Sequence, residues 1–349
     1  MTPARPPLFS IIVVNYNGLS FLKGCFDSLL GTTYPSVEIL MVDNGSTDGS
    51  VPFVERNYPQ VKLIKSPTNL SYSGGNNLGI RHASGDYIVL LNNDTEVTPG
   101  WLEPLAEEFA SDRTIAACQP KILMMTDRSS FEYSGAAGGY MDWFGYPFLR
   151  GRIFDVIEQD HGQYQNQVDL FWTSGAAMAI RKSVLDEIGL LDEDFVLHME
   201  EIDLCWRMHL MGYRLRARPD AVIYHFGGGT LGRDQVAKLY YNIRNSIFML
   251  LKNVSARRLF WVLPIRALLD LAFLFKSLFT LDVKRAAAVP AAYAWLLIHL
   301  RLILKKRREI QRRRTVSDMA IDPLLYPGSL VVAYFIGRKR TFTELWPRE

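Results

Sequence analysis

Short apolar runs alternate with helix-like segments over the first 94 residues of the chain. The apolar runs, rich in β-branched residues, predict strands over residues 8–14, 37–42, 61–65 and 87–91. The segments between them predict helices over residues 20–30, 51–58 and 76–83. This alternation is typical of parallel βαβ units with right-handed crossovers. We therefore expect an α/β fold whose sheet binds its ligand at the carboxyl ends of the strands.

Polar clusters follow three of these predicted strands, around Asn15, Asp43 and Asp94. Any one of them alone would be explained as a turn, because Asn, Asp and Gly are common turn residues. Three such clusters at one edge of a parallel sheet favour a binding site instead.

Asp94 ends the run Asn92-Asn93-Asp94 and is a candidate metal ligand. A hard cation such as Mg²⁺ or Mn²⁺ prefers oxygen ligands and keeps positions for substrate phosphates. His225, at the end of the strand predicted over 221–224, is the second candidate ligand, although a lone histidine is about as often structural. The run Gly227-Gly228-Gly229 that follows favours a mobile loop closing over a ligand.

A helix predicted over residues 199–211 carries the candidate general base. Glu201 shares an apolar, inward-facing stripe with Cys205, and desolvation there would make it a better base. Glu200 and Asp203 fall on another face, where acidic residues of a first turn complement the helix dipole. That structural explanation fits these two residues better than it fits Glu201.

Asp43 and the glycine-rich helix entrance Gly74-Gly75-Asn76-Asn77 are candidate donor-binding elements. Asp43 can accept a hydrogen bond from an N–H group of a ligand, and the alternative capping role suits Thr47 or Asp48 better. The helix entrance can bring backbone N–H groups near a phosphate, but it lacks the lysine and hydroxyl of a P-loop.

The middle of the chain is mixed in pattern. It predicts a helix after Trp101, a loop-rich stretch over 126–167 and a helix from Lys182. It predicts strands near 115–123, 176–180, 214–217 and 221–224.

Charge divides the chain into two unequal parts. Residues 1–250 carry 20 Lys and Arg against 29 Asp and Glu, a net charge of −9. Residues 251–349 carry 19 against 7, a net charge of +12, so the whole chain has a net charge of +3. We therefore expect a catalytic domain over 1–250 and a basic, hydrophobic, helical membrane-associating region over 251–349. The three widely spaced cysteines offer neither a disulfide framework nor a metal-ligand spacing, which favours a reduced, cytoplasmic setting.

Several of these motifs together resemble the family 2 glycosyltransferases, and among them the bacterial rhamnosyltransferase-like members. The resemblance rests on three strand-end motifs, Ser10–Gly18, Val42–Ser50 and Leu90–Thr95. It continues, in the order of the family, through Asn69–Gly79, Ser174–Met178, Glu200–Arg207 and Tyr224–Gly228, and it covers about residues 8–250.

The resemblance implies a Rossmann-like, nucleotide-sugar-binding fold of the GT-A type with a mixed, mainly parallel sheet. Beyond the part that it covers, the residues after 250 predict C-terminal amphipathic and hydrophobic helices. It implies that the nucleotide sugar contacts Val14, Asn15, Asp43, Asn77, Asn92 and Asn93. It assigns Asp94 and His225 to a Mn²⁺ or Mg²⁺ ion and Glu201 to the general base. Asn92 departs from the acidic residue frequent at this position, which would weaken metal affinity.

The resemblance also bears on the reaction. The resemblance implies transfer with inversion. We expect a single sugar to be added, since the processive Gln-X-X-Arg-Trp signature is absent. The donor would be a UDP- or dTDP-sugar, with rhamnose suggested, and the acceptor a lipid-linked or surface glycan, with Trp172, Ser174 and Gly175 as lining candidates. A nucleotidyltransferase on a similar sheet and a non-catalytic membrane-bound scaffold are the alternatives.

The C-terminal region predicts helices over 259–281 and 286–304, followed by the polybasic run 305–314. Arg266, Asp270 and Ser277 lie near one face of the first helix, as in a helix lying in a membrane interface. Charges at mid-bilayer disfavour a simple span, and a polybasic run suits anionic lipid. We expect a peripheral or monotopic protein at the cytoplasmic face of the inner membrane, with a homo-oligomer contact as the second explanation. Nucleic acid is not expected, because the run lacks interleaved aromatic residues.

Overall fold

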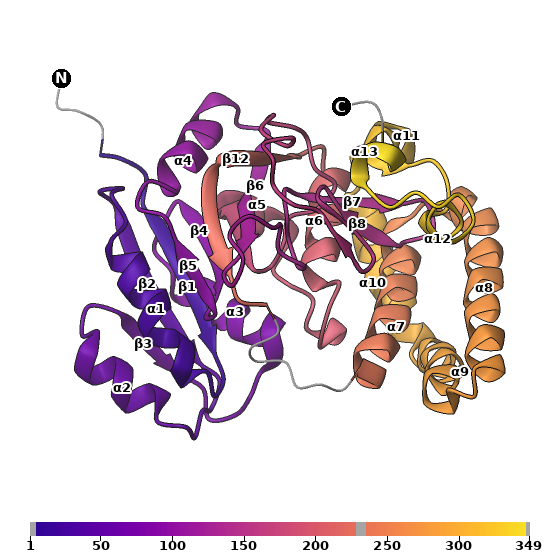
Figure 1. The fold of residues 1–349 in the computed structure, drawn as a ribbon, viewed down its shortest axis with the longest axis horizontal. Coiled ribbons are helices and arrows are strands. Elements are labelled where there is room, and N and C mark those ends of the chain that lie inside the picture. Colours follow the sequence, from indigo (N-terminus) through magenta and orange to yellow (C-terminus); the bar gives the residue numbers. More distant parts are fainter. Residues whose placement is uncertain (1–4, 228–234, 347–349) are drawn as a thin grey trace.

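An eight-stranded mixed sheet forms the centre of the protein, whose computed structural model describes residues 5–227 and 235–346 (Figure 1). The strand order is β3-β2-β1-β4-β11-β6-β12-β5. The strands are β1 (Phe9–Asn15), β2 (Val37–Asp43), β3 (Lys62–Lys65), β4 (Tyr87–Asn92), β5 (Thr95–Val97), β6 (Ile115–Met124), β11 (Ala177–Arg181) and β12 (Arg214–His225). All but β5 and β11 run in the same direction, so the expected mixed, mainly parallel sheet is confirmed.

Helices cover both faces of this sheet. They are α1 (Leu19–Leu30), α2 (Ser50–Asn57), α3 (Ser71–His82), α4 (Leu102–Ser111), α5 (Lys182–Ile188) and α6 (Glu200–Leu210), with a 3₁₀ turn η1 (Glu193–Phe195). Alternate residues of a strand enter different cores: Leu90 packs in the cluster that includes α3 and α6, and Leu91 in the cluster that includes α1 and α4. Burial on both faces explains why the strands read as continuous apolar runs.

A second sheet, absent from the sequence prediction, takes all but one of its strands from the stretch expected to be loop-rich, and the remaining strand comes from near the C-terminus. Its order is β10-β9-β8-β7-β13, and its strands are β7 (Gly139–Asp142), β8 (Pro147–Leu149), β9 (Arg152–Ile153), β10 (Val156–Ile157) and β13 (Leu325–Tyr326). The two strands predicted over 214–217 and 221–224 are instead one strand, β12, with a register shift between Arg218 and Val222.

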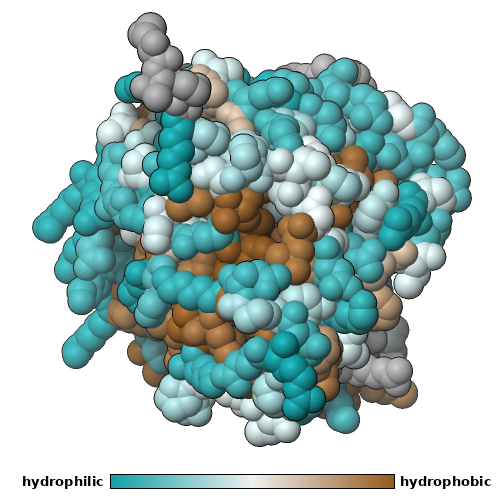
Figure 2. Space-filling view, turned by 90° about the vertical axis from the view of Figure 1, so that its left-hand side faces the viewer, coloured by the Kyte–Doolittle hydropathy of each residue, from teal (hydrophilic) through white to brown (hydrophobic). Residues whose placement is uncertain are grey.

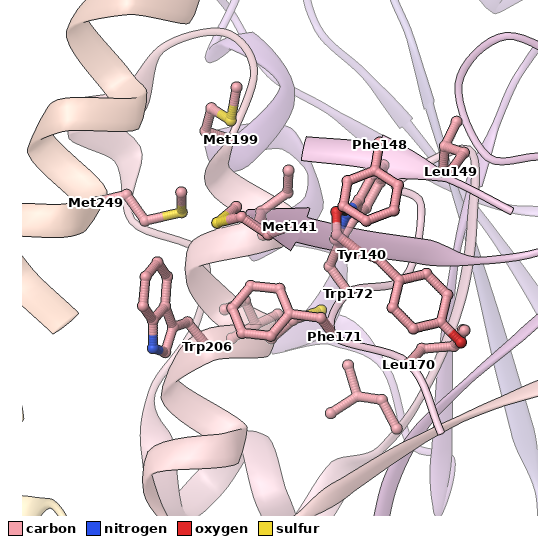
Figure 3. Close-up of a cluster of buried hydrophobic side chains, with 14 of the residues drawn as sticks. Tyr140, Met141, Phe148, Leu149, Leu170, Phe171, Trp172, Met199, Trp206 and Met249 are labelled. Atoms are coloured by element: carbon pink, nitrogen blue, oxygen red, sulfur yellow. Dashed lines mark hydrogen bonds between the residues drawn. The ribbon is translucent and has the colours of Figure 1, made fainter. Parts of the chain in front are cut away.

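The C-terminal region packs closely against the rest of the chain. Strand β13 pairs in parallel with β7, and the Leu330 N–H donates to the Asp142 carboxylate at 2.8 Å. Figure 3 shows Met249 of α7 beside Met141 of β7 and Trp206 of α6, in one buried cluster. The boundary at residue 250 stays a prediction, and the parts on either side of it share a sheet and a core.

The C-terminal helices are α7 (Gln235–Asn253), α8 (Ala256–Phe279), α9 (Val283–Ile298) and α10 (Leu300–Arg313). Shorter elements follow: α11 (Asp318–Ile321), η2 (Asp322–Leu324), α12 (Leu330–Phe335) and α13 (Phe342–Leu345). Within the described residues no single helix has the length and apolar character of a membrane span, and only the pair α9 and α10, bent by 70° at their junction, meets those criteria jointly.

The polar face of α8 points into the protein rather than outward, and the predicted position of this helix in a membrane interface stays a prediction. Arg266, Asp270 and Ser277 are all buried. Arg266 Nε lies 3.1 Å from Asp270 Oδ2, and the hydroxyls of Tyr146 and Tyr293 donate to the same carboxylate. Periodicity identifies one polar face correctly, but buried partners rather than lipid headgroups or water satisfy it.

The side of the molecule formed by α1 and α2 is seen face-on in Figure 2, where hydrophilic residues surround a central band of hydrophobic ones. Among residues 5–100, only Tyr16, Leu30 and Leu70 are exposed large hydrophobic side chains.

Candidate active site

The polar ends of the central strands meet at one edge of the sheet. Asn15 pairs with Asp43 in the register of β1 and β2, and Val14 pairs with Asn92 in that of β1 and β4. Asn93 Nδ2 donates to Asn15 Oδ1 at 2.7 Å. The structure therefore brings the three predicted polar clusters together, because parallel neighbours carry their carboxyl ends to the same edge.

Asp94 and His225 form a buried pair at this edge. The β12 register places His225 opposite Thr95 of β5, and His225 Nε2 lies 3.0 Å from Asp94 Oδ1. Asn92 approaches the same imidazole nitrogen, with its Nδ2 3.1 Å from Nε2. Two residues that are 131 positions apart in sequence thus converge as predicted for a shared ligand.

Glu132 is a third member of this cluster, and no sequence pattern indicates it. It follows β6 in a segment without clear periodicity, yet it is buried, and its Oε1 lies 3.2 Å from His225 Nδ1. The distance permits an ion pair, although no well-aligned hydrogen bond forms at Nδ1. Burial disfavours the imidazolium, but the hydrogen bond to Asp94 and the negative charges of Asp94 and Glu132 outweigh it and raise the pKa of His225 to about 10.

The donor atoms at this cluster suit a hard divalent cation. Asp94 supplies a carboxylate oxygen, and His225 would supply an imidazole nitrogen once the metal displaces the proton that the neighbouring carboxylates hold on the ring. Within residues 5–227 and 235–346, no three His, Cys, Asp or Glu side chains are arranged to hold a metal ion by themselves. A site with two protein ligands leaves coordination positions for phosphate oxygens of a substrate. Gly228 and Gly229 of the predicted mobile loop lie outside the described residues.

We expect Glu132→Gln to weaken metal affinity about 10–100-fold, because a carboxylate behind a histidine ligand orients the ring and raises its basicity. Mn²⁺ titration followed by calorimetry in the presence of nucleotide measures this. Glu158→Gln, at another carboxylate of the same segment, is the control. Equal metal affinity of Glu132→Gln and the unmodified protein would show that Glu132 has no such role.

Asp43 lies at the end of β2 with one carboxylate oxygen engaged and one without a hydrogen-bond partner. Its Oδ2 accepts from the N–H groups of Gly45 and Ser46 at 3.2 and 3.0 Å. Its Oδ1 is buried and has no partner in the structure. A buried, unpaired acceptor carries a free-energy cost of about 1–3 kcal/mol, which a ligand N–H group would remove.

Helix α3 packs closely against β1 because it carries a glycine at the contact. A Cβ on Gly75 would lie 2.7 Å from Val14 Cγ1, so glycine at this position lets α3 approach β1. Asn77 is buried and structurally engaged: its Nδ2 donates to the Leu191 carbonyl and to Glu193, and its Oδ1 accepts from the Leu191 N–H. Asn77 therefore ties α3 to η1, and its predicted contact with the nucleotide sugar stays a prediction.

Glu201 lies in the first turn of α6, near the same sheet edge. Residues 173–176 connect the two places: the Asn92 N–H donates to the Ala176 carbonyl at 3.1 Å, and the Tyr72 hydroxyl donates to the Gly175 carbonyl at 2.7 Å. The Thr173 N–H donates to Cys205 Sγ of α6 at 3.4 Å, which ties the same residues to the helix that carries Glu201.

Glu201 and its neighbour Glu200 each keep one carboxylate oxygen without a hydrogen-bond partner. The Glu201 side chain is partly accessible, whereas Glu200 is buried. Desolvation, only partly offset by backbone N–H groups, raises the pKa of Glu201 to about 7. Burial and the nearby Glu201 charge raise the pKa of Glu200 well above its ordinary value. A carboxylate with a free oxygen and a pKa near neutrality is suited to general-base catalysis.

Comparison with known proteins supplies the family. The model of glycosyl transferase family 2 matches residues 10–189, just over half of the chain. The chain belongs to glycosyl transferase family 2. The expected family and an enzyme of the glycosyltransferase class are thereby confirmed.

Relatives of this family 2 glycosyltransferase agree with its fold. An N-acetylglucosaminyl-diphospho-decaprenol L-rhamnosyltransferase from Mycobacterium tuberculosis is 24% identical over 73% of this chain and 87% of its own. The structure of a mannosyltransferase from Pyrobaculum calidifontis with GDP-Man and Mn²⁺ matches with a TM-score of 0.51 at 19% identity, over 99% of this chain and 89% of that one. The structure of GalNAc-T7 with UDP, GalNAc and Mn²⁺ matches with a TM-score of 0.55 at 17% identity, over 71% of this chain and about half (48%) of that one.

The three predicted acceptor-side residues of this family 2 glycosyltransferase are placed differently from one another. Trp172 is buried in the cluster of Figure 3, and its indole N–H donates to the Tyr140 carbonyl at 2.8 Å. Ser174 is buried, with its N–H bonded to Gln119, and Gly175 contacts Tyr72. An acceptor role for all three stays a prediction.

Proposed function

We propose that this chain transfers a single sugar, with inversion, from a UDP- or dTDP-sugar to a lipid-linked or surface-glycan acceptor. The observation that carries the proposal is the position of two chemically different groups at one sheet edge. The Asp94–His225 pair follows β4, which the Asn92–Ala176 hydrogen bond ties to residues 173–176, and the Thr173–Cys205 hydrogen bond ties the same residues to α6, whose first turn carries Glu201.

The residues of the chain divide the work between donor and acceptor. The unpaired oxygen of Asp43 accepts the ring N–H that uracil and thymine both carry. Val14 and Asn15 lie beside it, at the end of the neighbouring strand β1. Asn93 holds Asn15 in place through its side-chain amide. A divalent cation held by Asp94 and His225 would neutralise charge that develops on the departing diphosphate.

The transfer itself is a single displacement. The acceptor hydroxyl gives its proton to the Glu201 carboxylate, and its oxygen bonds to the anomeric carbon. The bond between that carbon and the diphosphate oxygen breaks, and its electron pair leaves with the diphosphate. Attack opposite to the leaving group inverts the configuration at the anomeric carbon, as one base and one leaving-group site imply.

The acceptor class follows from the relatives. The mycobacterial relative is named for a lipid-linked N-acetylglucosaminyl diphosphate acceptor and an L-rhamnosyl donor. We extend the lipid-linked acceptor to this chain, with rhamnose as the first donor sugar to test.

The donor base is tested by calorimetric titration of UDP, dTDP, GDP and ADP with Mn²⁺ present. We expect UDP or dTDP to bind and the purine nucleotides to bind weakly. Asp43→Asn should lower UDP or dTDP affinity about 10–100-fold, because a hydrogen bond to a charged group contributes about 1.5–3 kcal/mol. Asp27→Asn, at an exposed carboxylate of α1, is the control. A GDP affinity equal to that for UDP or dTDP would rule out the proposed donor class.

A further inference from the structure

Helix α8 presents an apolar face to the outside of the molecule. It forms the right-hand edge of the protein in Figure 1, and its buried face carries the Arg266–Asp270 ion pair. Along its opposite face, Phe260 is 85% exposed, Leu268 65% and Phe279 88%. Between Arg257 and Lys276 this outward face has no charged residue, over about five turns of helix.

The apolar surface continues through the turn into α9. Leu281, in the turn, is 85% exposed, and Val283, Leu297 and Ile298 are exposed as well. Of the 24 exposed large hydrophobic side chains among the described residues, 14 lie within residues 260–304. We call this surface the α8–α9 face. Its members are Phe260, Trp261, Ile265, Leu268, Leu271, Phe275, Leu278, Phe279, Leu281, Val283, Leu297, Ile298, Leu300 and Leu304.

The C-terminal helix α12 extends the same surface. Lys276 Nζ lies 4.9 Å from the centre of the Phe335 ring, so α12 adjoins the end of α8. Phe335 and the neighbouring Ile336 are both exposed. Contiguous apolar surface of this kind on a folded chain marks a site for a partner or a membrane.

Positive charge accompanies the α8–α9 face. Among residues 256–314, nine exposed residues are Lys or Arg and one, Glu309, is acidic. The nine are Arg257, Lys276, Lys284, Arg285, Arg301, Lys305, Arg308, Arg312 and Arg313. Two copies of such a surface would place like charges together, whereas anionic lipid headgroups would meet them with opposite charge.

We propose that the α8–α9 face docks on an anionic membrane surface, with its apolar side chains among the acyl chains and its basic residues at the headgroups. Apolar residues on one side and Lys and Arg beside them are the pattern of helices that lie in a membrane interface. This surface takes no part in the proposed nucleotide binding. A failure of the membrane-docking proposal can therefore be told apart from a failure of the proposed donor site.

The test is flotation of the purified full-length chain with vesicles of phosphatidylcholine alone or mixed with phosphatidylglycerol. We expect the chain to float with the mixed vesicles and much less with phosphatidylcholine alone. The triple variant Phe260→Glu, Leu268→Glu, Phe279→Glu should lose more than tenfold in bound fraction, because each change removes apolar contact and adds repulsion. Lys284→Gln should lower binding about fivefold at low salt, the equivalent of one basic residue near the surface.

Leu30→Glu is the matched control, since it places the same charge at an exposed leucine of α1, outside the α8–α9 face. It should float like the unmodified chain. The triple variant and Leu30→Glu should both bind UDP as tightly as the unmodified chain does. Two results would overturn the proposal. One is flotation unaffected by the triple variant. The other is a stable dimer in lipid-free solution that the triple variant converts to monomer, which would assign the face to a second copy of the chain.

Discussion

Replacing Glu201 with glutamine is expected to lower the rate of sugar transfer about 10²–10⁴-fold, the usual contribution of a general base. The amide keeps the shape of the side chain but cannot take the acceptor proton. Binding of the nucleotide should be unchanged, because Asp43 and its neighbours at the ends of β1 and β2 are untouched. Steady-state kinetics with a fixed donor concentration measures the change in kcat.

Glu200→Gln is the matched control for this experiment. Glu200 is buried beside Glu201 in the same turn of α6, and burial holds the pKa of its carboxyl well above the usual range, so the substitution keeps the side-chain shape and leaves the Glu201 carboxylate in place. We expect it to retain most of the activity. A similar loss in both variants would indicate a structural effect on the first turn of α6 rather than loss of a base.

The same assignment predicts the pH dependence. The pKa of Glu201 is raised to about 7, and the base form is the ionised one. The rate of the unmodified enzyme should therefore rise as pH increases through about 7 and level off above it. In Glu201→Gln this rising limb should be absent from the residual activity.

Replacing Asp94 with asparagine is expected to reduce transfer about 10²–10³-fold, the scale of losing one group that stabilises charge in a transition state. The amide oxygen is a weaker ligand than the carboxylate, and the substitution removes negative charge from the site beside His225. The measurement is transfer rate against Mn²⁺ concentration. Higher Mn²⁺ should restore part of the activity.

Asp112→Asn, at an exposed carboxylate paired with Arg214, is the control for the loss of one negative charge. It should leave the Mn²⁺ dependence unchanged. If Asp94→Asn keeps the full rate and the same Mn²⁺ dependence, Asp94 is not a metal ligand.

The central sheet is well predicted by the sequence because its signals are local. Each of β1, β2 and β4 is a continuous apolar run that ends in a polar cluster, and both features come from consecutive residues. The convergence of those clusters then follows from parallel pairing alone. The grouping of Asn15, Asp43 and Asp94 can therefore be predicted from the amino-acid sequence by itself.

Other features depend on partners far along the chain. Strands β9 and β10 have two residues each, too short to show a period, and β7 pairs with β13 from near the C-terminus. Glu132 joins His225 only because the segment after β6 folds back against the end of β6, where the Glu132 N–H donates to the Ile122 carbonyl. On α8, periodicity separates a polar from an apolar face, but it does not say which is buried. The polar face is buried because Arg266 finds its partner Asp270 inside the protein, and that carboxylate accepts hydrogen bonds from Tyr146 and Tyr293.

The proposed reaction is tested most directly by following the anomeric configuration of the first sugar product by NMR. The enzyme would be supplied with Mn²⁺, a panel of UDP- and dTDP-sugars that includes dTDP-rhamnose, and an N-acetylglucosaminyl-diphospholipid acceptor. We predict one added sugar with a configuration opposite to that of the donor, formed only while Mn²⁺ is available and lost on chelation. A product that retains the donor configuration, or transfer that continues unchanged after chelation, would contradict the roles given to Glu201, Asp94 and His225.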